Sequence, residues 1–145
     1  MFRCVFLLFW CTVIFISTCS ASLESFLEHG ILHFNWTGNP SFADLFHAMP
    51  ESPSLAFLLR KLGHAFVFFF LTAALFLLKR NLTFSGLAAF SFAVTTEILQ
   101  LFFARDGRLF DVGFDSFGIV LALILLAVVT HSYKKRAETV HYLDK

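Results

Sequence analysis

The residues best suited to chemistry in this sequence are carboxylates and an amide within the stretch 95–118. Glu97 and Gln100 precede a short polar turn, and Asp111 and Asp115 follow it, in segments otherwise apolar enough to sit in a bilayer. A charged group at membrane depth costs on the order of 2.5–3.5 kcal/mol on insertion scales, so its presence indicates a function or a partner. Such carboxylates can serve as a general base or hold a cation.

Helical spacing predicts that these side chains converge. Glu97 and Gln100 are three residues apart and share one helix face. Asp111 and Asp115 are four apart and share a face if their helix begins early enough. We also expect Gly107 to allow a tight turn between the two pairs.

A third apolar segment supplies basic residues at the same end. Arg60 and Lys61 lie four and three residues before His64, which places all three on one side of a helix. We expect Gly113 and Gly118, on the last segment, to let helices approach closely.

Polar groups from three helices are therefore predicted to meet at one membrane face in a single binding pocket. Its predicted members are Arg60, Lys61, His64, Glu97, Gln100, Arg105, Asp111 and Asp115. Candidate catalytic residues are Glu97, His64 and Asp115, but whether any reaction occurs stays open. A buried Glu97 needs a cation or donor, for which His64, Lys61 and Arg105 are candidates. Arg105 or Arg108 could pair with Asp111 or Asp115.

Simpler roles are open for several of these residues. Arg60 and Lys61 also suit side chains that snorkel to the interface, and Asp115 suits the negative charge favoured near a helix N-terminus. A buried pair at Glu97 could serve helix association alone.

A metal site is a further alternative. Together, His64, Glu97, Asp111 and Asp115 would suffice for a divalent ion. Because the sequence has no HExxH pattern and its spacing does not demand a metal, we expect neither metal nor cofactor.

The composition requires a membrane around these residues. Of 145 residues, 58% are hydrophobic, 14% are charged and 22 are Phe, and the mean hydropathy is +0.77. Soluble domains average roughly 45–50% apolar and about 25% charged. We predict an all-α membrane protein, a bundle of four transmembrane helices with one long outer loop. Without a long basic block, nucleic acid is not an expected partner.

The chain divides at changes of hydropathy. We predict a first transmembrane helix over 1–21, an extracytoplasmic loop over 22–61, a three-helix core over 62–130 and a cytoplasmic tail over 131–145. The core spans are expected at about 62–78, 82–104 and 112–130. Small residues after the first segment also fit a signal-peptidase site, but its apolar run favours a retained helix. Short amphipathic helical turns are expected after Ser22 and Ser41.

The distribution of Lys and Arg predicts the orientation. Six basic residues flank one side of the four spans, namely Arg3, Lys79, Arg80, Lys134, Lys135 and Arg136, and four flank the other. The positive-inside rule then assigns both termini to the cytoplasm of a multi-pass cell-membrane protein and the polar pocket to the outer face.

Three motifs resemble the VanZ-like family. They are RKLGH at 60–64, TEILQLF at 96–102 and RDGRLFDVGFDSFG at 105–118, in that order, and the likeness extends over about 60–129. One departure is Ser116, where Asn or Thr is common. The family's namesake is linked to low-level teicoplanin resistance in Gram-positive bacteria, without a settled mechanism.

The resemblance implies a role in glycopeptide susceptibility through an outer-face pocket. Its partners would be the lipid bilayer and a lipid-linked cell-wall precursor or a glycopeptide. The alternative from another class is a membrane-embedded hydrolase or transferase acting on a lipid-linked substrate, with Glu97 or Asp115 as general base and His64 as its partner.

Overall fold

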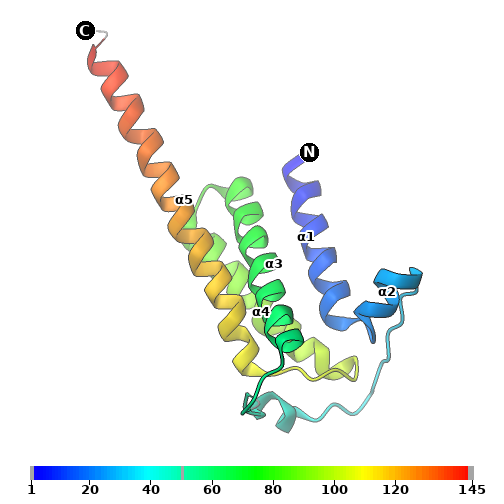
Figure 1. The fold of residues 1–145 in the computed structure, drawn as a ribbon. Coiled ribbons are helices and arrows are strands. Elements are labelled where there is room, and N and C mark those ends of the chain that lie inside the picture. The colour runs from blue at the N-terminus through cyan, green and yellow to red at the C-terminus, as the bar shows by residue number, and fades with distance from the viewer. Residues whose placement is uncertain (1, 50, 144–145) are drawn as a thin grey trace.

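A computed structural model describes residues 2–49 and 51–143, and these residues form only helices and connecting segments (Figure 1). The elements are α1 (Phe2–Cys19), α2 (Leu23–His29), the 3₁₀-helix η1 (Phe42–Phe46), α3 (Leu55–Lys79), α4 (Leu82–Phe102) and α5 (Leu109–Leu143). The predicted all-α class is confirmed.

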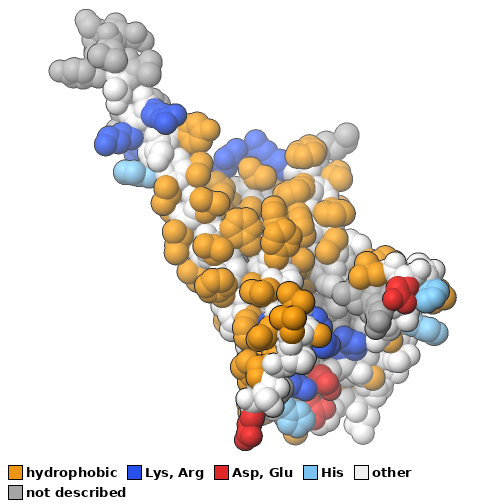
Figure 2. Space-filling view, in the orientation of Figure 1, with side chains coloured by type: hydrophobic (Ala, Val, Ile, Leu, Met, Phe, Trp, Pro, Cys, Tyr) orange, Lys and Arg blue, Asp and Glu red, His pale blue; other side chains and the backbone are white. Residues whose placement is uncertain are grey.

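Four of these helices are long and apolar enough to cross a membrane: α1, α3, α4 and the part of α5 up to Arg136. The shortest, α1, has 18 residues and is about 27 Å long at ~1.5 Å per residue, close to the ~30 Å of a bilayer's hydrocarbon core. Apolar side chains cover the middle of the molecule, with Lys and Arg at both ends (Figure 2). This distribution is typical of a membrane-spanning bundle.

The four long helices alternate in direction. Both chain termini lie at one end of the bundle, while the loop between α1 and α3 and the turn between α4 and α5 lie at the other (Figure 1). Helix α3 contacts each of the other three. The core combines Ile14 of α1, Phe68 and Leu71 of α3, Ala93 of α4 and Ile119 of α5.

Helix α3 begins seven residues earlier than the predicted span. Ser54 caps it by accepting a hydrogen bond from the Phe57 backbone N–H at 3.2 Å. Arg60 and Lys61, assigned from the sequence to the end of the loop, therefore lie within the helix. Helix α5 begins three residues before the predicted Val112, so Asp111 falls in its first turn.

At its other end α5 continues as a helix through most of the predicted tail 131–145, whose last two residues lie outside the described part of the chain.

The predicted outer loop contains both expected short helices, and it folds back on the ends of α1 and α4. The backbone N–H of Ala21 donates to the His33 carbonyl, and that of Thr37 donates to the Phe102 carbonyl, each at 2.8 Å. The Trp36 ring stacks on the ring of Phe102 at 5.6 Å. The loop is thus anchored beside the turn that follows α4.

Glycine permits the closest helix contact. A side chain at Gly118 would collide with the backbone carbonyl oxygen of Ala65, so α5 approaches the backbone of α3 directly. The expected close approach at Gly118 is confirmed. The same expectation for Gly113 is wrong, because that residue is exposed and has open space beside it.

Candidate functional site

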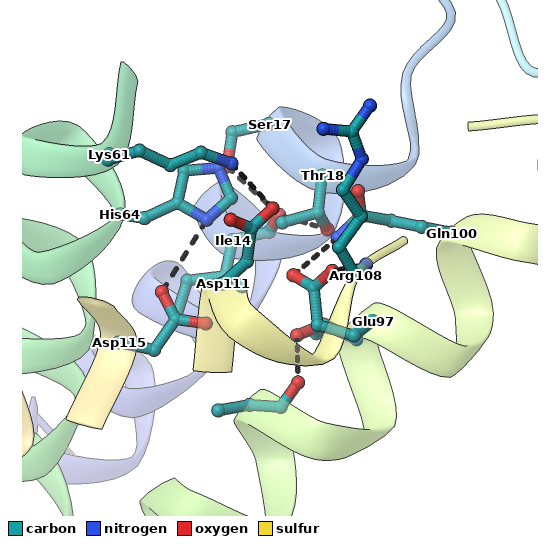
Figure 3. Close-up of polar contacts among 12 residues, drawn as sticks. Ile14, Ser17, Thr18, Lys61, His64, Glu97, Gln100, Arg108, Asp111 and Asp115 are labelled. Carbon is teal, nitrogen blue, oxygen red and sulfur yellow. Dashed lines mark hydrogen bonds and ion pairs between the residues drawn. The ribbon is translucent and has the colours of Figure 1, made fainter. Parts of the chain in front are cut away.

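Glu97 is fully buried and lies five residues before the end of α4. Its Oε1 accepts a hydrogen bond from Gln100 Nε2 at 2.8 Å, and its Oε2 accepts one from the Arg108 backbone N–H at 2.7 Å (Figure 3). Both carboxylate oxygens are therefore held, but not by the predicted partners His64, Lys61 or Arg105.

The turn after α4 folds back tightly on this carboxylate. A side chain at Gly107 would collide with the backbone carbonyl of Glu97, so the residue must be glycine for Arg108 to reach the Glu97 carboxylate. The tight turn predicted at Gly107 matches this arrangement.

Lys61 of α3 and Asp111 of α5 form a buried ion pair. The Lys61 Nζ donates to Asp111 Oδ2 at 2.5 Å, and the two side chains are only 11% and 5% exposed. The same ammonium lies 4.9 Å from the ring centre of Phe57 and 5.3 Å from that of Phe110, within range of cation–π attraction. The expected pairing of Asp111 with an arginine is wrong, since Lys61 takes that place.

His64 faces Asp115 across the interface between α3 and α5. Its Nδ1 lies 3.5 Å from Asp115 Oδ1, and Asp115 is fully buried (Figure 3). Within residues 2–49 and 51–143, neither oxygen of Asp115 nor Nδ1 of His64 has a hydrogen-bond partner. Buried polar groups without partners are rare and costly in native proteins, so Asp115 is the least satisfied carboxylate in this cluster.

The side chains of His64, Glu97 and Asp115 lie close together. One ligand-type atom from each of the three residues lies within 4.8 Å of the other two. These residues come from α4, α5 and α3, so three helices converge here as the spacing predicted.

A cavity of about 370 Å³ opens beside this cluster. Its charged lining consists of four basic side chains, Arg60, Lys61, Arg105 and Arg108, and two acidic ones, Asp106 and Asp111. The other polar side chains in the lining are those of His64 and Gln100. Six of the eight predicted site residues line the cavity, while Glu97 and Asp115 are buried beside it.

Helix α1 is a fourth helix that contributes polar side chains beside the cluster, which the sequence analysis did not predict. A second cavity of about 560 Å³ is lined by Ser17 and Thr18 of α1 together with His64 and Arg105. Arg105 Nη1 donates to the Ala21 backbone carbonyl at 2.8 Å, which ties the α4–α5 turn to the end of α1. The signal was present in the polar pair Ser17-Thr18, which belongs to the small residues that also fit a signal-peptidase site.

Comparisons with known proteins converge on one family. The VanZ/LLP1 family model matches residues 3–130, which include every residue of the polar cluster. The chain is also similar to the uncharacterized membrane protein YwnJ of Bacillus subtilis (strain 168), with 33% identity over 113 residues, covering 77% of this chain and 81% of that protein. No solved structure matches the chain.

Proposed function

Because this chain belongs to the VanZ/LLP1 family of membrane proteins, we propose that it lowers the susceptibility of the cell envelope to glycopeptide antibiotics such as teicoplanin. The polar cavity at the end of the bundle engages an envelope component. The observation that carries this proposal is a cavity whose charged lining is mainly basic, four basic side chains to two acidic ones, beside a fully buried Glu97.

The proposed location is the cell membrane, with both termini and the tail 131–145 in the cytoplasm. The connection between α1 and α3 and the cavity then face outward, with the predicted core 62–130, extended by the earlier start of α3, in the bilayer. Support comes from the excess of Lys and Arg at the end that carries the termini. Outward placement puts the cavity where lipid-linked wall precursors and glycopeptides are found.

The charge of the cavity favours an anionic ligand. Four basic side chains face two acidic ones, and Lys61 and Asp111 neutralise each other. Arg60 and Arg105 remain, and neither forms an ion pair with a carboxylate in the described part of the chain. Guanidinium groups bind phosphate bidentately, so the phosphate of a lipid-linked precursor suits this cavity better than a neutral ligand.

Expression in a susceptible Gram-positive host tests the proposal. The wild-type chain is expected to raise the minimal inhibitory concentration of teicoplanin, and His64→Ala, Glu97→Ala and Asp115→Ala are expected to abolish that rise. Membrane fractionation establishes that each variant inserts. If all three variants insert normally and protect as the wild type does, the cavity does not carry the phenotype.

A second candidate is a membrane-embedded hydrolase or transferase. The proximity of His64, Glu97 and Asp115 favours it, since a histidine beside two buried carboxylates can move a proton to or from a substrate held in the adjacent cavity. Turnover of a lipid-linked envelope substrate by purified protein, lost in Glu97→Gln, supports this candidate. Unchanged substrate at prolonged incubation rules it out for the substrate tested.

A further inference from the structure

We propose that His64, Glu97 and Asp115 bind a divalent transition-metal ion, with Zn²⁺ as the representative ion, in the wall of the polar cavity. This site goes beyond the proposed role in glycopeptide susceptibility and does not depend on it.

The three residues already have the arrangement of a ligand set. Their candidate donor atoms lie within 4.8 Å of one another. Zinc bonds of about 2.0–2.2 Å put tetrahedral ligands roughly 3.4 Å apart, so the side chains must close by about 1 Å or more around an ion. Because each ligand comes from a different helix, the ion would also join α3, α4 and α5.

The unsatisfied side chain of Asp115 is the independent observation. Asp115 is fully buried, and among the described residues neither of its oxygens has a hydrogen-bond partner. The same holds for His64 Nδ1, which lies 3.5 Å from Asp115 Oδ1. A bound cation would satisfy these atoms together, whereas the 3.5 Å contact between them compensates their burial only in part.

The charges of the cluster lead to the same conclusion. Three carboxylates, on Glu97, Asp111 and Asp115, are buried with one ammonium, on Lys61. When all four are ionised, these buried groups alone carry two net negative charges. Arg60 and Arg105 line the adjacent cavity, whereas a divalent cation would neutralise the carboxylates at their own oxygens. Buried charges in proteins are paired or coordinate metals, and Lys61 is already committed to Asp111.

Two hydrogen bonds fix the orientation of the Glu97 side chain, as is usual for carboxylates that bind metal ions. Its oxygens accept from Gln100 Nε2 and from the Arg108 backbone N–H. A carboxylate offers about four lone-pair sites, so both oxygens can still bind an ion. Such outer hydrogen bonds hold metal ligands in place.

The donor atoms indicate the kind of ion. One imidazole with two carboxylates suits Zn²⁺ and related transition metals, whereas Mg²⁺ and Ca²⁺ prefer oxygen ligands alone. Three protein ligands leave an open coordination position, as in catalytic zinc sites. His64 lines the cavity, so a molecule in the cavity could reach that position. The sequence analysis named His64, Glu97 and Asp115, with Asp111, as a sufficient ligand set, but it expected no metal because their spacing does not demand one.

The test measures metal binding by the full chain purified in detergent and stripped with a chelator. Equilibrium dialysis with Zn²⁺ is expected to give one tightly bound ion per chain. The substitutions His64→Gln, Glu97→Gln and Asp115→Asn are each expected to weaken binding at least about 10-fold. The matched exposed substitutions His131→Gln and Glu28→Gln are expected to bind as the wild type does. The proposal is wrong if the wild type binds no more Zn²⁺ than the detergent blank, or if both sets of variants bind alike.

A measurement on the wild type alone covers the case in which a variant fails to fold. Co²⁺ in place of Zn²⁺ reports its ligands through its absorption spectrum. Nitrogen and oxygen ligands give weak visible bands without an intense sulfur-to-metal band. An intense band of that kind would assign the ion to Cys4, Cys11 or Cys19 and would overturn the proposal.

Discussion

At the scale of single residues, the buried polar side chains of the cluster differ sharply in the hydrogen-bond and ion-pair partners that they have. Glu97 has a hydrogen bond to each oxygen, Asp111 has its ammonium partner, and fully buried Asp115 has only a histidine at 3.5 Å. Stability alone would favour replacing such a set by apolar residues, because buried ion pairs seldom stabilise more than well-packed hydrophobic side chains do. We propose that binding accounts for their presence.

The ion pair of Lys61 and Asp111 gives a prediction about stability. Lys61→Met leaves the Asp111 carboxylate buried without its partner and is expected to cost about 3–5 kcal/mol of unfolding free energy. The double substitution Lys61→Met with Asp111→Leu removes both charges and is expected to be closer to the wild type. Thermal unfolding in detergent measures both.

The exposed substitution Lys134→Met is the control for the lost lysine, and it is expected to leave the unfolding midpoint unchanged. A double variant less stable than Lys61→Met would show that Asp111 has a second favourable partner.

At the scale of helices, the site depends on how closely α5 approaches α3. Gly118 lies directly on the backbone of Ala65, one residue from His64 along α3 and three from Asp115 along α5. A change in that contact would separate the two side chains. Helix packing therefore sets the distance between His64 and Asp115.

Two glycines on the same helix provide a matched test of this packing. Gly118→Ala places a methyl group against the Ala65 carbonyl and is expected to destabilise the protein by about 1–3 kcal/mol. Gly113→Ala meets open space and is expected to be neutral or stabilising by up to ~1 kcal/mol, since alanine favours helix. Thermal unfolding midpoints that fall equally for both variants would contradict the close approach.

Helical periodicity predicted which residues share a helix face, but not how the helices are rotated against one another. Spacing of three and four residues placed Glu97 with Gln100 and brought three helices to one end. It could not select Lys61 over an arginine for Asp111, because those residues are 50 positions apart and meet only through the packing of α3 on α5. The start of α3 was missed because Arg60-Lys61 resembled a membrane boundary, whereas the Ser54 cap lies earlier.

At the scale of the whole molecule, the proposed function places the cavity and the termini on opposite sides of the membrane. Four spanning helices put both termini at one end and the α4–α5 turn at the other (Figure 1). The excess of basic residues at the end that carries the termini supports the proposed cytoplasmic placement of that end.

Single-cysteine labelling in a background without Cys4, Cys11 and Cys19 checks this orientation in intact cells. Gly107 would be a poor reporter because any side chain there collides with Glu97, whereas Asp106 is exposed. Asp106→Cys is expected to react with a membrane-impermeant thiol reagent added outside, and Lys135→Cys to react only after the cells are permeabilised. The reverse pattern would turn the cavity toward the cytoplasm.

The most direct measurement of the central claim identifies the molecule that the cavity holds. Mass spectrometry of lipids that co-purify with the chain is expected to find a phosphate-bearing envelope lipid with the wild type. The amount is expected to fall at least about 10-fold with Arg60→Gln and Arg105→Gln together. These substitutions remove the two cavity cations that form no ion pair with a described carboxylate. The exposed pair Lys134→Gln and Lys135→Gln is expected to retain the lipid. Equal lipid recovery from the wild type and the cavity variant would contradict the account.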